Sequence, residues 1–196
     1  MKQDPRHLGA RCDVCPLGPR GCLRNDEPWV PTPPEEHGSA VVALLEAPAK
    51  EDFLKHRPLA GLDGGEWRRA LTASGLNRKQ IDLHFLVSCM PPDGWKRMEA
   101  SLKRKRKAAE TRLRKNGMSL AEAKHAAAQE LPHPVDCCAP MCHSRLNNYD
   151  YVLALGASPA QSLLDTKRSM SDLDGDMRSL PASRVFRHGA DWSFAE

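Results

Sequence analysis

The chain has 196 residues, of which 40% are hydrophobic and 28% charged, and its formal net charge is +4. This length suffices for one sizeable hydrophobic core but is short for two ordinary domains. No apolar run approaches the roughly 20 residues that span a bilayer, and the N-terminal stretch MKQDPRHLGAR lacks the apolar centre of a secretory signal. We therefore expect one intracellular, monomeric domain over residues 1–196, with no membrane segment.

The leader contains a C-x-x-C pair, Cys12 and Cys15, in a Gly- and Pro-rich stretch before any strand signal. A thioredoxin-type redox pair would instead lie between a strand and a helix. The other cysteines lie at positions 22, 89, 137, 138 and 142, which makes an odd total of seven. In a reducing compartment this set favours metal ligation over disulfides. Zinc and an iron–sulfur cluster suit the spacing about equally, and buried cysteines without a metal are the third alternative.

Three short apolar runs predict buried strands, at residues 39–47, 83–89 and 151–158. Helices are predicted at 64–76, from the spacing of Trp67 and Leu71, and at 158–165, with Ser158 as N-cap and Pro159 in the first helical position. A weaker fourth strand is predicted at 183–188. Strands that alternate with helices indicate an α/β fold, here a three-layer sandwich around a central four-stranded parallel sheet.

The carboxyl ends of the predicted strands mark the expected position of a site. In open parallel sheets, ligands bind beyond these ends. The residues that follow or end the strands are therefore expected to cluster at one rim; they are Glu46, Pro48, Cys89, Gly156 and His188.

The most distinctive segment is the basic stretch 96–115, KRMEASLKRKRKAAETRLRK, with ten Lys or Arg residues, two Glu residues and a net charge of +8. Because the whole chain carries +4, the remainder sums to −4. Asn116 and Gly117 predict the end of a helix, the SLAE sequence from Ser119 predicts a capping box that begins a second helix, and Pro132 ends it. We expect a helical hairpin at residues 96–132, inserted between the second strand and the last cysteines.

This density of positive charge favours an arm that contacts nucleic-acid phosphates over a solvated surface helix. An acidic face of a protein partner is the alternative. The predicted DNA contacts are the basic side chains of the arm, Lys103, Arg104, Lys105, Arg106, Lys107, Arg112 and Arg114.

Four motifs occur in a fixed order along the chain. They are CDVCPL, LLEAPAKEDFLKHRPLAGLDG, CMPPDG, and CAPMCHSRL followed by YDYVLALGASPAQSLL. In this order they resemble the uracil-DNA glycosylase superfamily, particularly its iron–sulfur-containing family 4. The likeness covers most of the chain apart from the basic hairpin, and it implies a DNA glycosylase-like fold and activity.

The resemblance also implies a [4Fe–4S] cluster bound by Cys12, Cys15, Cys89 and Cys138. Cys138 fits the fourth position because, as in the family, a proline follows two residues later, at Pro140, and a helix is expected after that proline. Cys137 and Cys142 are the alternatives for that ligand, and Cys22 is expected to bind nothing. The implied role of the cluster is structural, joining the N-terminal leader to the sheet.

A glycosylase must hold an extruded base and bring water to the sugar carbon. By the resemblance, Glu46 corresponds to the water-activating glutamate and His188 to the histidine that stabilises charge on the departing base. A carboxylate at the end of a buried strand is costly unless it is used or paired, which agrees with this role. The corresponding base pocket contains Ala47, Pro48, Leu59 and Phe85.

Several residues depart from the family pattern. Phe85 replaces the asparagine that reads the uracil edge, Leu59 replaces the stacking phenylalanine, and Leu45 replaces the first glycine of the G-E-A-P-G motif. Glycine also follows His188 in place of proline, and only eight residues remain after this histidine, fewer than the closing helix and DNA-penetrating loop of the family need. Either the chain is detached from something larger, or part of the base-flipping apparatus is missing.

Two functions from different classes follow. The first is a DNA glycosylase-like enzyme that uses Glu46 and His188 on uracil or another altered base. The second is a non-catalytic iron–sulfur DNA-binding relative that uses the basic hairpin. The loss of the recognition asparagine favours this second function, because a site without the amide that hydrogen-bonds the base edge no longer discriminates between bases. A redox or zinc protein unrelated to DNA is the remaining alternative.

Overall fold

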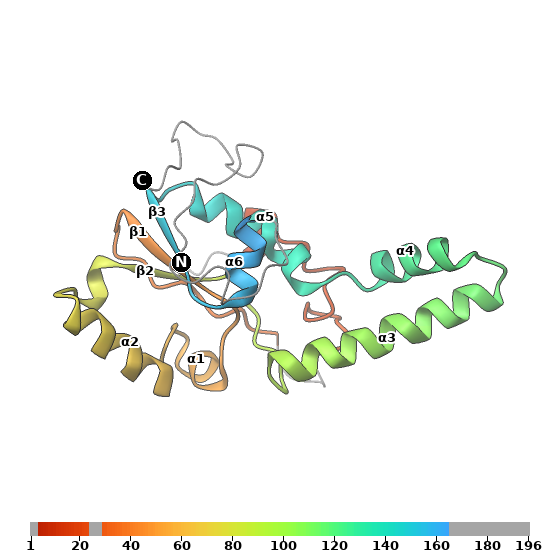
Figure 1. Cartoon of the computed structure of the whole chain (residues 1–196), viewed down its shortest axis with the longest axis horizontal. Helices are drawn as coiled ribbons and strands as arrows, with labels where there is room; N and C mark the ends of the chain where they lie inside the picture. The colour runs from red at the N-terminus through yellow and green to blue at the C-terminus, as the bar shows by residue number, and fades with distance from the viewer. Residues whose placement is uncertain (1–3, 24–28, 165–196) are drawn as a thin grey trace.

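The computed structural model describes residues 4–23 and 29–164 (Figure 1). The α/β class predicted from the sequence is confirmed, with a three-stranded parallel sheet in the order β2-β1-β3. The predicted fourth strand at 183–188, and His188 with it, lie outside the described residues. In chain order the elements are η1 (Pro5–Leu8), β1 (Val41–Leu45), α1 (Lys50–Lys55), α2 (Leu62–Ala73), η2 (Arg78–Gln80), β2 (Asp82–Phe85), α3 (Trp95–Lys115), α4 (Leu120–Glu130), α5 (Pro134–Leu146), β3 (Tyr151–Ala154) and α6 (Ala157–Leu164).

The central strand β1 is buried on both faces. Successive side chains of a strand point to opposite faces, so Val42 and Leu44 share one face and Ala43 lies on the other. On the first face they pack with α5 and α6, through Leu146 and Leu163 among others. On the second face, Ala43 packs with Leu71 of α2 and with Leu83 of β2. Burial on both sides explains why the strand has a continuous apolar sequence.

The helices that follow β1 and β3 therefore lie on opposite faces of the sheet. The chain after β1 enters α1 and α2, on the face of Ala43, whereas the chain after β3 enters α6, on the face of Val42 and Leu44. β1 and β3 are neighbours in the sheet. In doubly wound sheets this change of side opens a crevice at the carboxyl ends of the two strands, which is where ligands bind.

The second strand is shorter than the predicted run of 83–89. It ends at Phe85, although its backbone partnership continues: Leu86 N–H donates to the Leu45 carbonyl at 2.7 Å, and Val87 N–H to the Glu46 carbonyl at 3.0 Å. Leu86 and Val87 pack into two different core clusters, so the apolar sequence continues where the strand does not. An apolar run alone does not distinguish a buried strand from a buried loop.

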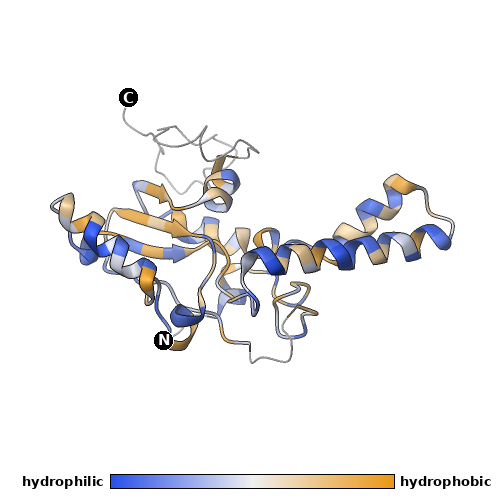
Figure 2. Cartoon of the chain, turned by 60° about the horizontal axis from the view of Figure 1, so that its bottom comes forward, coloured by the Kyte–Doolittle hydropathy of each residue, from blue (hydrophilic) through white to orange (hydrophobic). Residues whose placement is uncertain are grey.

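The hairpin of α3 and α4 extends away from the sheet as a long arm (Figure 1). Its turn follows the sequence: Gly117 has φ +92°, and the Ser119 and Glu122 side chains each accept a hydrogen bond from the other residue's backbone N–H, at 3.3 and 3.0 Å. Ala123 and Ala127 of α4 are buried, and such small side chains let two helices approach closely. Figure 2 shows hydrophilic colour along much of α3 and hydrophobic colour on much of the sheet. Within the described ranges, no helix is long and apolar enough to cross a membrane.

Candidate functional site

Five cysteines lie in one hydrophobic cluster of the core. They come from three separate parts of the chain: the leader, the segment after β2, and α5. All are buried, with at most 8% of any of them exposed. The structure thus brings the four predicted ligands together, and the five residues are Cys12, Cys15, Cys89, Cys137 and Cys138.

The leader is held on α5 by backbone hydrogen bonds beside these thiols. Arg11 N–H donates to the Cys137 carbonyl at 2.9 Å, and the Arg11 guanidinium donates to the Asp136 carbonyl at 3.0 Å. The Asp136 carbonyl needs a donor because Pro140, four residues further along α5, has no N–H to offer. The loop of the leader is tight, since a Cβ added at Gly18 would lie 1.8 Å from the Cys12 carbonyl oxygen. Glycine is therefore required there.

Helix α5 begins earlier than the family pattern implies. The helix was expected after Pro140, but it begins at Pro134 and contains all three cysteines of the last cluster. Cys137 and Cys138 face the leader, whereas Cys142 lies in the other core cluster with Val42 and Leu44. Cys22 is exposed. Of the alternatives for the fourth ligand, the structure therefore keeps Cys137 beside Cys138 and places Cys142 elsewhere.

The chemistry of the thiol cluster fits an iron–sulfur group. Burial raises the pKa of Cys12 to about 11, so without a cation this thiol stays protonated. Backbone N–H groups already reach two of the sulfurs, from Leu17 to Cys15 and from Ser88 to Cys138, as in sites where hydrogen bonds tune the sulfur ligands. Within residues 4–23 and 29–164, no three His, Cys, Asp or Glu side chains converge on the position of a single metal ion. The cysteines therefore fit an iron–sulfur group in their type of donor atom and in their burial.

Glu46 lies at the carboxyl end of β1, in the crevice between β1 and β3. Its carboxylate accepts a hydrogen bond from the Ser158 hydroxyl, which belongs to the first turn of α6. Both residues line an open pocket of about 650 Å³, together with Trp95, Lys96 and Arg97 from the start of α3. The expected rim is thus formed by Glu46 and by the segment from Gly156, and the base of the basic arm adjoins it.

Burial raises the pKa of Glu46, and the negative charge of Glu99 raises it further. The Ser158 hydrogen bond acts in the opposite direction because it stabilises the ionised carboxylate, but it does not outweigh the other two effects. A raised carboxyl pKa in a pocket is typical of a group that exchanges protons.

Ser158 and the two cations of the first turn of α3 are among the pocket residues that the sequence did not point to. Ser158 was expected to cap α6, but the helix begins at Ala157 and its hydroxyl donates to Glu46 instead. Because helix ends vary by a residue or two, the position of Ser158 shortly after Gly156 was only a weak indication that its side chain reaches the pocket. Lys96 and Arg97 belong to the recognised basic segment but were not singled out within it.

The four residues predicted to form a base pocket do not line the Glu46 pocket. Phe85 is only 2% exposed and Pro48 is buried, so neither presents a surface to a ligand. Ala47 packs against the thiol cluster. Leu59, with φ +50°, packs against the cluster on the α2 face and lines a separate pocket of about 200 Å³.

The predicted DNA contacts all lie on α3, and six of the seven are exposed. Arg106 is half-buried and donates to the Leu131 carbonyl at 2.8 Å, which ties the two helices together. Lys107 pairs with Glu110 at 2.8 Å, and Arg112 pairs with Glu130 of α4 at 2.5 Å. Within the described part of the chain, the remaining four, Lys103, Arg104, Lys105 and Arg114, form no salt bridge.

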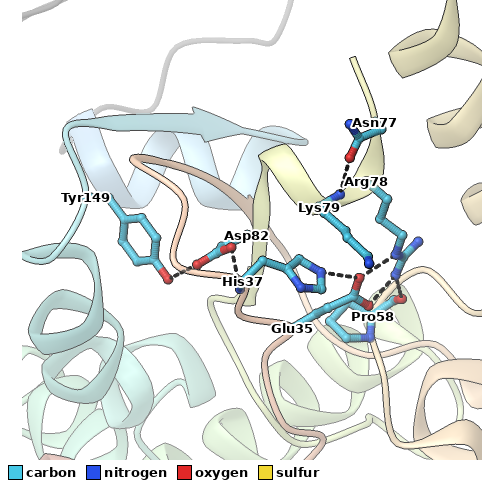
Figure 3. A network of polar contacts seen from close by, with 8 residues as sticks. All are labelled: Glu35, His37, Pro58, Asn77, Arg78, Lys79, Asp82 and Tyr149. Carbon is cyan, nitrogen blue, oxygen red and sulfur yellow. Dashed lines mark hydrogen bonds and ion pairs between the residues drawn. The ribbon is translucent and has the colours of Figure 1, made fainter.

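A second polar cluster lies at the opposite, amino-terminal edge of the sheet (Figure 3). Asp82 accepts hydrogen bonds from the Tyr149 hydroxyl at 2.9 Å and from the His37 N–H at 2.8 Å. Glu35 forms a two-point pair with Arg78, at 2.6 and 2.7 Å. Each carboxylate is thus satisfied by partners within the protein.

Comparison with known proteins adds no family to this picture: no protein-family model matches the chain, and no curated protein matches it. The resemblance to the uracil-DNA glycosylase superfamily therefore depends on the four sequence motifs.

Proposed function

We propose that the protein is a DNA glycosylase-like enzyme that binds DNA and hydrolyses the N-glycosidic bond of uracil or another altered base. The observation that carries the proposal is Glu46: a half-buried carboxylate with a raised pKa, held by one hydroxyl, in a pocket at the crevice of the sheet. At about 650 Å³ the pocket is within the usual range for small ligands, roughly 300–1,000 Å³. The basic arm adjoins it, so bound DNA lies near the carboxylate.

The chemistry assigned to Glu46 is that of a general base. The ionised carboxylate accepts a proton from water as the water oxygen bonds to the sugar C1′, and the bond from C1′ to the base nitrogen breaks, with its electron pair leaving on the base. Ser158 orients the carboxylate through its hydroxyl. The role of stabilising the departing base falls, by resemblance, to His188, which lies outside the described residues.

The thiol cluster would hold a [4Fe–4S] cluster through Cys12, Cys15, Cys89 and Cys138. When bound, the cluster supplies cross-links between the leader, the segment after β2 and α5, and takes no part in the hydrolysis. As part of the same proposal, we keep the fold that the sequence predicts, a three-layer sandwich with a fourth strand at residues 183–188.

One observation favours the second candidate, a non-catalytic DNA-binding relative. Phe85 and Leu59 do not reach the Glu46 pocket, so the side chains expected to read and stack a base are not assembled there. In this alternative the cysteine-containing fold supports the basic arm, and the arm alone carries the activity.

The deciding experiment compares base release by the wild type, Glu46→Gln and Glu66→Gln, using purified cluster-loaded protein and oligonucleotides that each carry one altered base. Glu66 is an exposed glutamate of α2 away from the pocket and serves as the matched control. We expect Glu46→Gln to slow release by about 100-fold or more with DNA affinity unchanged, and Glu66→Gln to behave as wild type. If no base is released from any substrate, or if Glu46→Gln releases the base as fast as wild type, the enzyme assignment is overturned and the non-catalytic DNA-binding protein is favoured.

The cofactor is tested separately by anaerobic purification and quantification of iron and sulfide. About four irons per chain are expected in the wild type and in Cys22→Ser, and a large loss in Cys138→Ser. A colourless protein with about one zinc per chain would contradict the iron–sulfur assignment.

A further inference from the structure

The cations of α3 are not spread evenly around the helix. At about 100° per residue, Lys96, Lys103, Lys107 and Arg114 fall within about 40° of one another, on one face. We call these four residues the cationic stripe. Arg104 and Lys105 lie about 80° and 180° away from its centre. The ten basic residues of the helix are thus divided into a single file of four and an off-stripe set of six.

The stripe begins at the Glu46 pocket and runs outward along the arm. Lys96 lines that pocket. Lys103 and Lys107 line the next hollow, a groove of about 500 Å³ between α3 and α4, where Lys124 of α4 adds a further cation. From Lys96 to Arg114 the helix rises about 27 Å, at about 1.5 Å per residue. Figure 1 shows that the arm projects away from the sheet.

Most of the stripe is free to bind an anion. Among residues 4–23 and 29–164, Lys96, Lys103 and Arg114 form no salt bridge. Lys107 pairs at 2.8 Å with Glu110, whose side chain is only 8% exposed, so this carboxylate competes with an anion for Lys107. Glu99 lines both the pocket and the groove, beside the stripe and toward α4.

Because the stripe is straight, it fits an extended single strand of DNA better than a duplex. In a duplex, each strand turns fully around the axis in about 34–36 Å, so over about 27 Å its phosphates rotate through roughly three quarters of a turn and leave a straight line. An extended single strand follows a straight line, and at roughly 6–7 Å per phosphate about four nucleotides span the stripe. The half-buried ring of Trp95 lines the pocket at the near end, where it offers a stacking surface for a base.

We propose that the cationic stripe is a track for one extended single strand of DNA that leads into the Glu46 pocket. The substrate is then a base in single-stranded DNA with about four nucleotides on one particular side. This inference rests on the proposed function only in taking the Glu46 pocket as the place where the base binds. The DNA binding that it describes does not depend on release of the base.

The test measures binding by fluorescence anisotropy with short oligothymidylates that carry one tetrahydrofuran abasic-site analogue, a mimic of the glycosylase product. The nucleotides are added on the 5′ side in one series and on the 3′ side in the other. Affinity is expected to rise over about four nucleotides on one side only, and to exceed that for the corresponding duplexes at equal salt. Equal dependence on both sides, or tighter binding of duplex, would overturn the track.

Two double variants with the same charge change separate the stripe from general basicity. Lys103→Gln with Lys107→Gln removes two stripe cations, and Arg104→Gln with Lys105→Gln removes two off the stripe. The first pair is expected to weaken single-strand binding at least tenfold and to reduce the slope of log affinity against log salt by about 1.4, at about 0.7 per phosphate contact. The sequence alone places Arg104 and Lys105 among the DNA contacts, but both lie off the stripe, so the track predicts that the second pair changes affinity less than twofold. Equal weakening by both pairs overturns the proposal, once circular dichroism shows that both variants remain folded.

The track and the enzyme fail in different ways. If no base is ever released but the one-sided length dependence is present and lost in the stripe variant, the track stands and the enzyme does not. If release depends on Glu46 while the two double variants bind DNA equally well, the enzyme stands and the track does not.

Discussion

The two edges of the sheet use their carboxylates in opposite ways. At the amino-terminal edge, burial opposes ionisation of Glu35, but hydrogen bonds from Arg78 and His37 outweigh it and lower its pKa (Figure 3). At the carboxyl-terminal edge, burial raises the pKa of Glu46, and the hydrogen bond from Ser158 does not offset it. The first carboxylate has a fixed charge that stabilises the fold, and the second is available to exchange a proton. The two edges of one small sheet thus shift the pKa of a carboxylate in opposite directions.

Removing Asp82 is expected to have the largest effect on stability. Asp82 is 1% exposed and accepts hydrogen bonds from Tyr149 and His37, so Asp82→Ala removes a buried acceptor from both donors and leaves the Tyr149 hydroxyl only His84 Nε2, at 3.0 Å. We expect the free energy of unfolding to fall by about 4 kcal/mol in urea titrations. The exposed Asp150, changed to Ala, is expected to cost less than about 0.5 kcal/mol. Similar losses for both would show that the amino-terminal edge is not specially stabilised.

The same edge predicts sensitivity to acid. Burial, aided by the charge of Arg145, lowers the pKa of His84 from 6.5 to about 4. Between these pH values the unfolded chain binds a proton that the folded chain does not, so stability falls as the pH falls, by about 3 kcal/mol in all. Urea unfolding at pH 7, 5.5 and 4 measures this loss. In His84→Gln the loss over this range should be smaller by a similar amount, and an unchanged pH dependence would contradict the assignment.

Breaking the pair between Glu35 and Arg78 is expected to have an intermediate effect. Glu35→Gln loses the charge of a partly buried two-point pair, and we expect it to lower the free energy of unfolding by about 2 kcal/mol at pH 7. Since the pKa of Glu35 is lowered, its contribution is present above the ordinary carboxyl pKa and is lost as the pH falls through the folded value, so the difference from wild type should shrink toward pH 3. A difference that is the same at pH 7 and pH 3 would rule out this electrostatic origin. In a double variant with Arg78→Gln, the loss should be less than the sum of the single losses.

Glu46→Gln is expected to have the smallest effect on stability, and in the opposite direction. Because the pKa of Glu46 is raised, its ionised form is less stable in the folded chain than in the unfolded one, and the stability is lost as the pH rises. The variant should therefore melt slightly above wild type at pH 8 and level with it at pH 4, as measured by circular dichroism. A lower melting temperature at pH 8 would place Glu46 with the stabilising carboxylates and remove the contrast between the edges.

Features set by short stretches of sequence were predictable. The end of α3 at Asn116 and Gly117, and the capping box of Ser119 and Glu122, depend on residues within a few positions of each other, and both are confirmed. Strand β1 was found from its apolar run because burial on both faces leaves no polar positions, whereas β2 contains the buried Asp82 and His84, and β3 was found although Tyr151 and Leu153 are exposed.

Features that depend on distant partners were not predictable. Ser158 meets Glu46 across 112 residues of sequence, and only the order of the strands brings them together. Helix α5 begins before Pro140 because Arg11, 125 residues from Asp136, satisfies the carbonyl that the proline leaves free. Phe85 matched the position of a base-reading residue by counting from Cys89, yet its side chain is buried in the core.

The root of the arm has a consequence for how the chain folds. The ring of Trp95 meets that of His133 edge-on, with centroids 5.9 Å apart, so the arm leaves the sheet and returns at nearly the same place. Once this local hairpin has formed, the path from Cys89 to Cys138 shortens from about 50 residues to about a dozen, which lowers the entropy cost of closing that loop by about 1 kcal/mol. Early formation of such sequence-local contacts favours fast folding. The arm then acts as a closed detour, whose length can change without moving the cysteines apart.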